Sequence, residues 1–164
     1  MRLERRYHAE AAHQLSAGVP EGHPCRRLHG HRYIITVTII GDVNPETGML
    51  LEYADIDARV AGVLGFVDHR FTNMLGFEAR VGTTPPGGFP VVMMKPISDL
   101  RLVEEELAAK VRENSTVENL ANWFKAELAH RFPRENLRVG PTSFLSPQVY
   151  AVRIEEDRDS VVEV

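Results

Sequence analysis

Histidine side chains gather near the beginning of the sequence, around its single cysteine, Cys25. Five of the seven histidines lie within the first 31 residues: His8, His13, His23, His29 and His31. Imidazoles and thiolates are ligands that zinc prefers, and the same groups act as acids, bases and nucleophiles. Because a lone cysteine cannot form an internal disulfide, this cluster predicts metal or proton-transfer chemistry and excludes a disulfide framework.

The spacing of His29-Gly-His31 is suited to metal binding if the two residues lie on a strand. Side chains two residues apart on a strand point to the same face, about 6–7 Å apart along the chain. A third ligand is then needed, and His13 is the natural candidate. Three neutral imidazoles with one open position form the ligand set of a catalytic zinc site. The alternative is that two polar side chains simply lie on a solvated face of the strand.

Cys25 lies four residues before His29 and directly before Arg26 and Arg27. Neighbouring cations favour the thiolate form, which is the nucleophilic and metal-binding form. Two roles therefore stay open for Cys25. It is either a nucleophile or base, or a fourth zinc ligand that would make the site closed and structural.

Three carboxylates are further candidates for chemistry. Asp68 directly precedes His69, and aspartate can orient a histidine and raise its basicity, although a simple turn after a helix explains the pair equally. Glu156 has the same strand parity as the apolar Val152 and Ile154, so its carboxylate is predicted to face the core. An acidic group there needs a partner or a ligand, unless the strand has already ended in a solvated charge run. Glu118 follows Ser115 by three residues, the spacing of a helix capping box.

The elements that hold these residues follow from the pattern of apolar side chains. A strand is expected over residues 32–41, with residues 1–8 as a pairing partner and 49–52 as a candidate extension. One helix is expected over 53–66, and a second from Thr116 to the residue before Pro133. Two more strands are expected over 136–144 and 148–156.

The segment 76–114 between the helices is less regular. It contains the loop Thr83-Thr-Pro-Pro-Gly-Gly88, the apolar Val91-Val-Met-Met94, and helical spacing from Leu100 to Val111 with Ser98 or Asp99 as the cap. A long connection of this kind is a lid, an interface element or disordered. The element order β-β-α-α-β-β predicts an α+β fold, with two helices on one face of an antiparallel sheet.

Composition limits the class of protein. The 164 residues are 43% hydrophobic and 26% charged, and the formal net charge is 19 − 23 = −4. This balance argues against a protein that binds nucleic acid or a membrane surface mainly through charge. No apolar run approaches the ~18 residues of a membrane span, and no apolar stretch follows the first charges as in a signal peptide. The expectation is a cytoplasmic protein with a reduced thiol.

Val19-Pro-Glu-Gly-His-Pro-Cys25 followed by Leu28-His-Gly-His31 resembles the family of 6-pyruvoyltetrahydropterin and 6-carboxytetrahydropterin synthases. Further matching segments follow in the family's order: Ala11-Ala-His13, Thr47-Gly-Met49, Val67-Asp-His69 with Asn73, and Ser115-Thr-Val-Glu-Asn119. The three residues between Cys25 and His29 resemble the spacing of the carboxytetrahydropterin branch.

The resemblance implies a single tunnelling-fold domain over residues 1–164, with an insert at about 76–114. Each subunit would supply a four-stranded antiparallel sheet with two helices on one face, and a hexamer or tetramer would form a barrel with active sites between subunits. It further implies three groups of site residues: His13, His29 and His31 for zinc; Cys25, Asp68 and His69 for proton transfer; Glu156, Thr116 and Glu118 for the pterin. Glu155 is an alternative to Glu156.

The reaction that the resemblance implies is the zinc-dependent conversion of 7,8-dihydroneopterin triphosphate to 6-carboxy-5,6,7,8-tetrahydropterin, with loss of acetaldehyde and triphosphate. This product leads to 7-deazapurines, including queuosine. Charge alone makes Arg26, Arg27, Arg32 and Lys95 candidates for the triphosphate. The alternatives are a pyruvoyltetrahydropterin synthase, an aldolase-like pterin enzyme and a non-catalytic pterin- or purine-binding protein. A zinc hydrolase is disfavoured because the sequence lacks a His-Glu-x-x-His helix.

Overall fold

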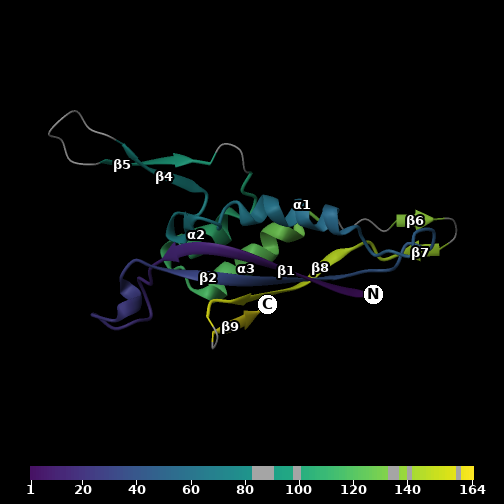
Figure 1. Ribbon diagram of the computed structural model, residues 1–164, viewed down its shortest axis with the longest axis horizontal. Coiled ribbons are helices and arrows are strands. Elements are labelled where there is room, and N and C mark those ends of the chain that lie inside the picture. The colour runs from purple at the N-terminus through teal and green to yellow at the C-terminus, as the bar shows by residue number, and fades with distance from the viewer. Residues whose placement is uncertain (83–90, 98–100, 133–136, 140–141, 158–159) are drawn as a thin grey trace.

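Two long strands, β1 (Arg2–His13) and β2 (His29–Ile40), pair antiparallel along their whole length (Figure 1). The computed structural model describes residues 1–82, 91–97, 101–132, 137–139, 142–157 and 160–164. The pairing confirms the strand expected at 32–41 and its partner at the start of the chain. Both strands are longer than expected, so that His13 and His29 lie directly opposite each other at one end of the ladder.

The sheet that grows from this pair has five strands in the order β3-β1-β2-β8-β9. The three added strands are β3 (Arg70–Phe71), β8 (Gln148–Glu155) and β9 (Val161–Glu163). Because β3 runs parallel to β1, the sheet is mixed, and the expectation of four antiparallel strands is wrong. The short β3 was missed because two residues carry no alternating pattern.

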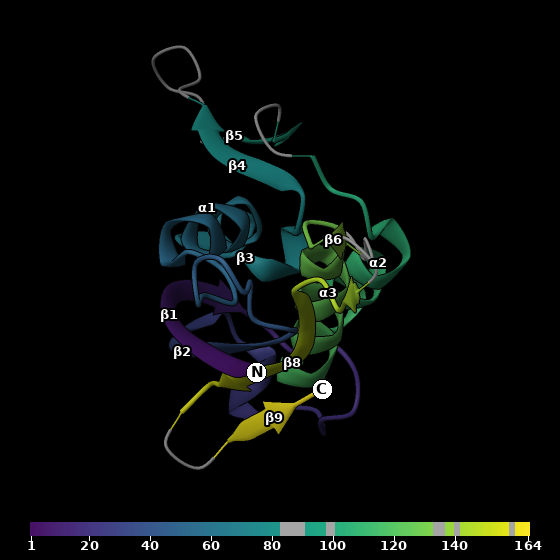
Figure 2. The same cartoon turned by 90° about the vertical axis from the view of Figure 1, so that its right-hand side faces the viewer.

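Three α-helices are present in the described part of the chain: α1 (Tyr53–Leu64), α2 (Glu105–Glu113) and α3 (Val117–Ala129). They lie on one face of the sheet (Figure 2). The helices expected from residues 53 and 116 are confirmed, and the α+β class with them. The count of two helices is wrong, because the helical spacing between Leu100 and Val111 forms α2. This helix begins at Glu105, and the expected caps Ser98 and Asp99 lie outside the described residues.

The core lies between this helical layer and one face of β1, β2 and β8. Ile35, Val37 and Ile39 of β2 are fully buried, as are Trp123 and Phe124 of α3. On β2 the same alternation continues backwards from these residues through Tyr33 to His31 and His29. The inward row of side chains therefore changes from aliphatic to imidazole at the end of the strand, which places the histidines at the margin of the core.

The remaining segments form short elements outside this sheet. Phe77–Gly82 (β4) and Val91–Pro96 (β5) make a hairpin that extends away from the helices and sheet (Figure 1). The strand expected at 136–144 is instead a second hairpin, of Leu137–Val139 (β6) and Thr142–Phe144 (β7). Residues 49–52 add no strand. No helix among the described residues has the length and apolar character needed to cross a membrane.

Candidate metal centre

His13, His29 and His31 form one cluster, with one nitrogen of each ring within 4.8 Å of the others. His13 and His29 face each other across the β1–β2 ladder, and their Nε2 atoms are 3.1 Å apart. His31 lies two residues along the same strand, with its ring 5.0 Å from that of His13. The three side chains predicted from sequence as metal ligands therefore meet at one point.

Backbone carbonyls fix the orientation of two of these rings. Nδ1 of His13 donates to the carbonyl of Ser115 at 2.6 Å, and Nδ1 of His29 donates to that of Arg27 at 2.7 Å. Since Nδ1 carries the hydrogen in each ring, Nε2 is left with a lone pair directed into the cluster. Two such nitrogens 3.1 Å apart repel each other unless a cation lies between them. The donor set and its outer hydrogen bonds therefore fit a divalent metal bound by three imidazoles.

Burial keeps His13 in the form that binds a metal. Its side chain is 3% exposed, and desolvation lowers the pKa of the imidazole. The end of β1 is held in place by Asn73, whose side-chain amide donates to the carbonyl of Gln14 and accepts from its N–H. Asn73, one of the residues in the matching segments, thus fixes the backbone beside the candidate ligand His13.

Glu156 approaches the cluster from the end of β8. Its Oε1 atom lies 3.3 Å from Nε2 of His13 and 3.9 Å from Nε2 of His31. The hydroxyl of Tyr33, a residue only 1% exposed, donates to the same oxygen at 3.1 Å. Burial and the carboxylate beside it raise the pKa of Tyr33 well above its usual range. Glu156 thus lies just beyond the end of β8, as the alternative had it, but its side chain is only 16% exposed and faces the cluster, whereas Glu155 pairs with Arg153.

A hollow of about 480 Å³ joins this cluster to the start of α3. His13 and Glu156 line it together with Thr116 and Glu118, so the proposed pterin residues share a cavity with a candidate metal ligand. The expected capping box is wrong by one residue. Thr116 is the N-cap and its hydroxyl accepts from the N–H of Asn119, because Ser115 is buried and its hydroxyl bonds to that of Thr72. Glu118 is thereby free of a capping role.

Cys25 lies outside the cluster in the described structure. It sits in a short 3₁₀ turn, Pro24–Arg26, and the residue is half-buried. His23 caps this turn by accepting from the Cys25 N–H at 3.2 Å, and the Cys25 carbonyl accepts from Leu15 at 2.8 Å. These bonds hold the loop against the end of β1, but they do not bring the thiol to the three imidazoles.

Asp68 and His69 lie at the other edge of β1. Nδ1 of His69 is 3.1 Å from Oδ1 of Asp68, and that oxygen also accepts from the N–H of Glu10 at 2.9 Å. Although partial burial opposes it, these hydrogen bonds lower the pKa of Asp68. The His69 side chain is 80% exposed, and its φ of 56° is in the left-handed region. For a residue other than glycine this conformation carries strain, which is typical of functional positions.

A second hollow, of about 460 Å³, opens beside His69 and is lined by Glu10, Gly30, His31 and Arg32 among others. Glu10 and Arg32 point away from the helices and form an ion pair of 2.5 Å on the outward face of the sheet. His31 is thus the one member of the cluster that also borders the His69 region among the described lining residues. Of the four basic candidates for the triphosphate, Arg32 lies here, and the side chain of Lys95 is outside the described residues.

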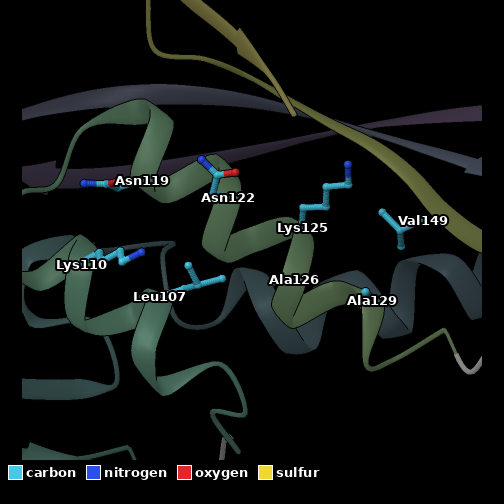
Figure 3. Close-up of a pocket in the computed structure, with 8 residues that line it drawn as sticks. All are labelled: Leu107, Lys110, Asn119, Asn122, Lys125, Ala126, Ala129 and Val149. Atoms are coloured by element: carbon cyan, nitrogen blue, oxygen red, sulfur yellow. The ribbon is translucent and has the colours of Figure 1, made fainter.

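A third hollow, of about 560 Å³, lies between α2 and α3 and opposite Val149 of β8 (Figure 3). None of the residues predicted to carry chemistry lines it. Lys110 and Lys125 border it, but the amide groups of Asn119 and Asn122 already donate to the backbone of Asn114 and Glu118. This hollow is therefore separate from the candidate site.

Sequence reasoning missed three supporting residues. Tyr33 could have been found, because it follows His31 by two residues and so lies on the same face of the strand. The role of Ser115 carries no sequence signal, since it acts through its backbone carbonyl, 102 residues from His13. His23, which had no assigned role, is the cap of the Cys25 turn.

A sequence profile of the 6-pyruvoyl tetrahydropterin synthase family matches residues 2–164, and the chain belongs to this family. Members of the family are lyases that act on pterins.

Among individual relatives, a protein of Pyrococcus horikoshii is 26% identical over 127 residues, which cover 77% of this chain and 74% of the relative. It bears the provisional name 6-carboxy-5,6,7,8-tetrahydropterin synthase. The structure of Caenorhabditis elegans 6-pyruvoyl tetrahydropterin synthase matches with a TM-score of 0.63 and 22% identity, over 100% of this chain and 94% of that one. An uncharacterized Wolinella succinogenes protein matches with a TM-score of 0.60 and 18% identity, over 100% and 97%. At these identities the two structures establish the fold alone.

Proposed function

We propose that the protein is a zinc-dependent lyase that converts 7,8-dihydroneopterin triphosphate and one molecule of water to 6-carboxy-5,6,7,8-tetrahydropterin, acetaldehyde and triphosphate. One observation carries the proposal: the three histidines and Glu156 meet beside a hollow that Thr116 and Glu118 also line. The provisional name of the Pyrococcus horikoshii relative and the three-residue spacing between Cys25 and His29 favour this product over others.

In this proposal, three groups of residues bind the metal, bind the pterin and transfer protons. His13, His29 and His31 hold the metal, which when bound supplies a Lewis acid that makes neighbouring hydroxyl groups more acidic. Thr116, Glu118 and Glu156 orient the pterin in the hollow, where a carboxylate matches a ring edge that presents N–H donors. Cys25, His69 and Asp68 move protons between the ring and its side chain, with Asp68 orienting the His69 imidazole.

The exposed position of His69 means that another surface must cover it before it can transfer protons to a bound substrate. His69 is 80% exposed and lies beside an open hollow on the outward side of β1. Since an acid–base group needs hydrogen-bond reach of the reacting atom, we propose that a second copy of the chain covers this region and completes the site.

The product of the reaction tests the assignment. We expect the zinc-loaded protein, incubated with 7,8-dihydroneopterin triphosphate, to form carboxytetrahydropterin and acetaldehyde in equal amounts, as measured by liquid chromatography and mass spectrometry. A pyruvoyltetrahydropterin product would instead support the alternative that the name of the family itself suggests. Tightly bound zinc without turnover of any pterin would identify a non-catalytic member and contradict the proposal.

A further inference from the structure

Glu156 lies very close to the candidate metal ligands, and binding of the pterin alone does not require such a short distance. Its Oε1 atom is 3.3 Å from Nε2 of His13, and its side chain is only 16% exposed. The proposed function assigns this carboxylate to the substrate, but in the structure it contacts two of the three imidazoles.

The distances among these atoms are those of a four-ligand metal site. Nitrogen and oxygen ligands lie about 2.0–2.1 Å from zinc, so neighbouring donors in a tetrahedron are about 3.3 Å apart. Nε2 of His13 is 3.1 Å from Nε2 of His29 and 3.3 Å from Oε1 of Glu156. The separation between Glu156 and His31 is wider, 3.9 Å. Two of these three distances thus match a tetrahedral site with Glu156 as the fourth donor.

Electrostatics favour the same arrangement. An enclosed carboxylate is costly unless a donor or a cation compensates its charge. Within the described residues, no lysine or arginine forms an ion pair with Glu156, and its side-chain contacts are the two histidines and the Tyr33 hydroxyl. A divalent cation among the imidazoles would supply the missing positive charge.

Tyr33 acts as the outer support of this carboxylate. It follows His31 by two residues on β2, and its ring packs against both His13 and His31, with centroid distances of 6.3 and 6.0 Å. Its hydroxyl donates to Oε1, the atom that faces the cluster. Hydrogen bonds of this kind to a ligating group hold it in the orientation that coordination needs.

We infer that Glu156 is the fourth metal ligand of the substrate-free protein and that it leaves the metal when a pterin enters the hollow. The inference rests on the proposed function for the identity of the incoming ligand, whereas the coordination itself requires only the metal. A closed set of four ligands keeps the Lewis acid inactive until substrate arrives, and the departing carboxylate remains in the hollow to meet the pterin.

The coordination is tested with zinc and cobalt alone. In wild type, Co²⁺ is expected to give the intense visible absorption of a four-coordinate site. Glu156→Gln, which keeps the shape of the side chain, should weaken zinc binding by at least about tenfold in competition with a chelator and should change the cobalt spectrum. Glu155→Gln is the matched control, since this neighbouring carboxylate pairs with Arg153 and should leave both measurements unchanged. Tyr33→Phe should weaken zinc binding by less than Glu156→Gln does.

The departure of Glu156 is tested by adding 7,8-dihydroneopterin to the cobalt protein. We expect the wild-type spectrum to change. Unchanged zinc affinity and spectrum in Glu156→Gln, or an equal loss in Glu155→Gln, would overturn the coordination, and an unchanged wild-type spectrum with pterin bound would overturn the departure. Failure of the lyase proposal is a separate result, since it appears as absent product in wild type while the metal measurements still stand. A wild-type chain that binds no metal overturns both.

Discussion

The histidine cluster and the Asp68–His69 corner are built in opposite ways around the same strand, β1. In the cluster, His13 is buried, and its ring is fixed by a carbonyl of a residue 102 positions away. At the corner, the His69 side chain is 80% exposed, and its recorded ion-pair partner is the adjacent Asp68. The first region is complete within one chain, whereas the second offers an acid–base pair to the exterior.

This difference separates binding from proton transfer. A metal site gains from preorganisation, because ligands already in place lose little entropy when the ion binds. A solvated histidine gains its catalytic value only when a substrate or another surface covers it and excludes water. The structure therefore leads to the expectation that mutations in the two regions fail in different ways.

The largest expected effect separates metal loss from loss of proton transfer. His31→Ala should lose bound zinc and activity together, whereas Cys25→Ala should keep zinc and lose at least about 100-fold in kcat, the usual contribution of an acid–base group. Zinc content by elemental analysis and product formation measure the two effects. His8→Ala is the control, because His8 is exposed on β1 and belongs to neither region. If Cys25→Ala also loses zinc, the thiol is a metal ligand, and metal binding and proton transfer do not depend on separate residues.

The sequence predicts the first region better than the second. His29 and His31 could be chosen because strand alternation converts a two-residue spacing into a shared face, and His13 as the candidate for the third ligand that such a site needs. The structure brings all three together. The same alternation drew attention to Glu156, but the strand ends at Glu155. The contact of Glu156 with His13 could not be predicted, because it depends on how the turn after β8 places the carboxylate. The left-handed backbone of His69 likewise has no signature in the sequence.

The same holds for the fold: elements with a repeated apolar pattern were predicted, and elements that depend on particular contacts were missed. Long apolar stripes predicted α1 and α3 correctly, since each stripe repeats over three turns. The two-residue β3 was beyond this kind of reasoning, because its pairing with β1 is a tertiary contact. The hairpin of β6 and β7 was missed because strands of three residues carry too little alternation to be recognised. The cap of α3 was misplaced by one residue for a related reason: Ser115 is drawn into the buried bond with Thr72.

A smaller effect is expected from combining defects of the two regions. If one chain's cluster works with another chain's His69, co-expressed His31→Ala and His69→Ala subunits should recover activity. Random pairing of neighbours gives about one quarter of the wild-type activity. The control pair, His31→Ala with His29→Ala, should recover none, because both defects fall in the same cluster. An activity of zero in the first pair, with mixed oligomers verified by mass spectrometry, would place the whole site within a single chain.

The smallest expected effect concerns the strain at His69. Its φ of 56° costs an alanine about 1 kcal/mol relative to glycine, since only glycine lacks the Cβ that clashes there. His69→Gly should therefore have a higher free energy of unfolding than His69→Ala by about that amount, as measured by urea denaturation, although both variants lose the imidazole. At His31, on a regular strand, the order should reverse and alanine should be the more stable replacement. Equal stability of the two His69 variants would show that the backbone at residue 69 adopts another conformation without cost. The contrast between a strained corner and a preorganised cluster would then be lost.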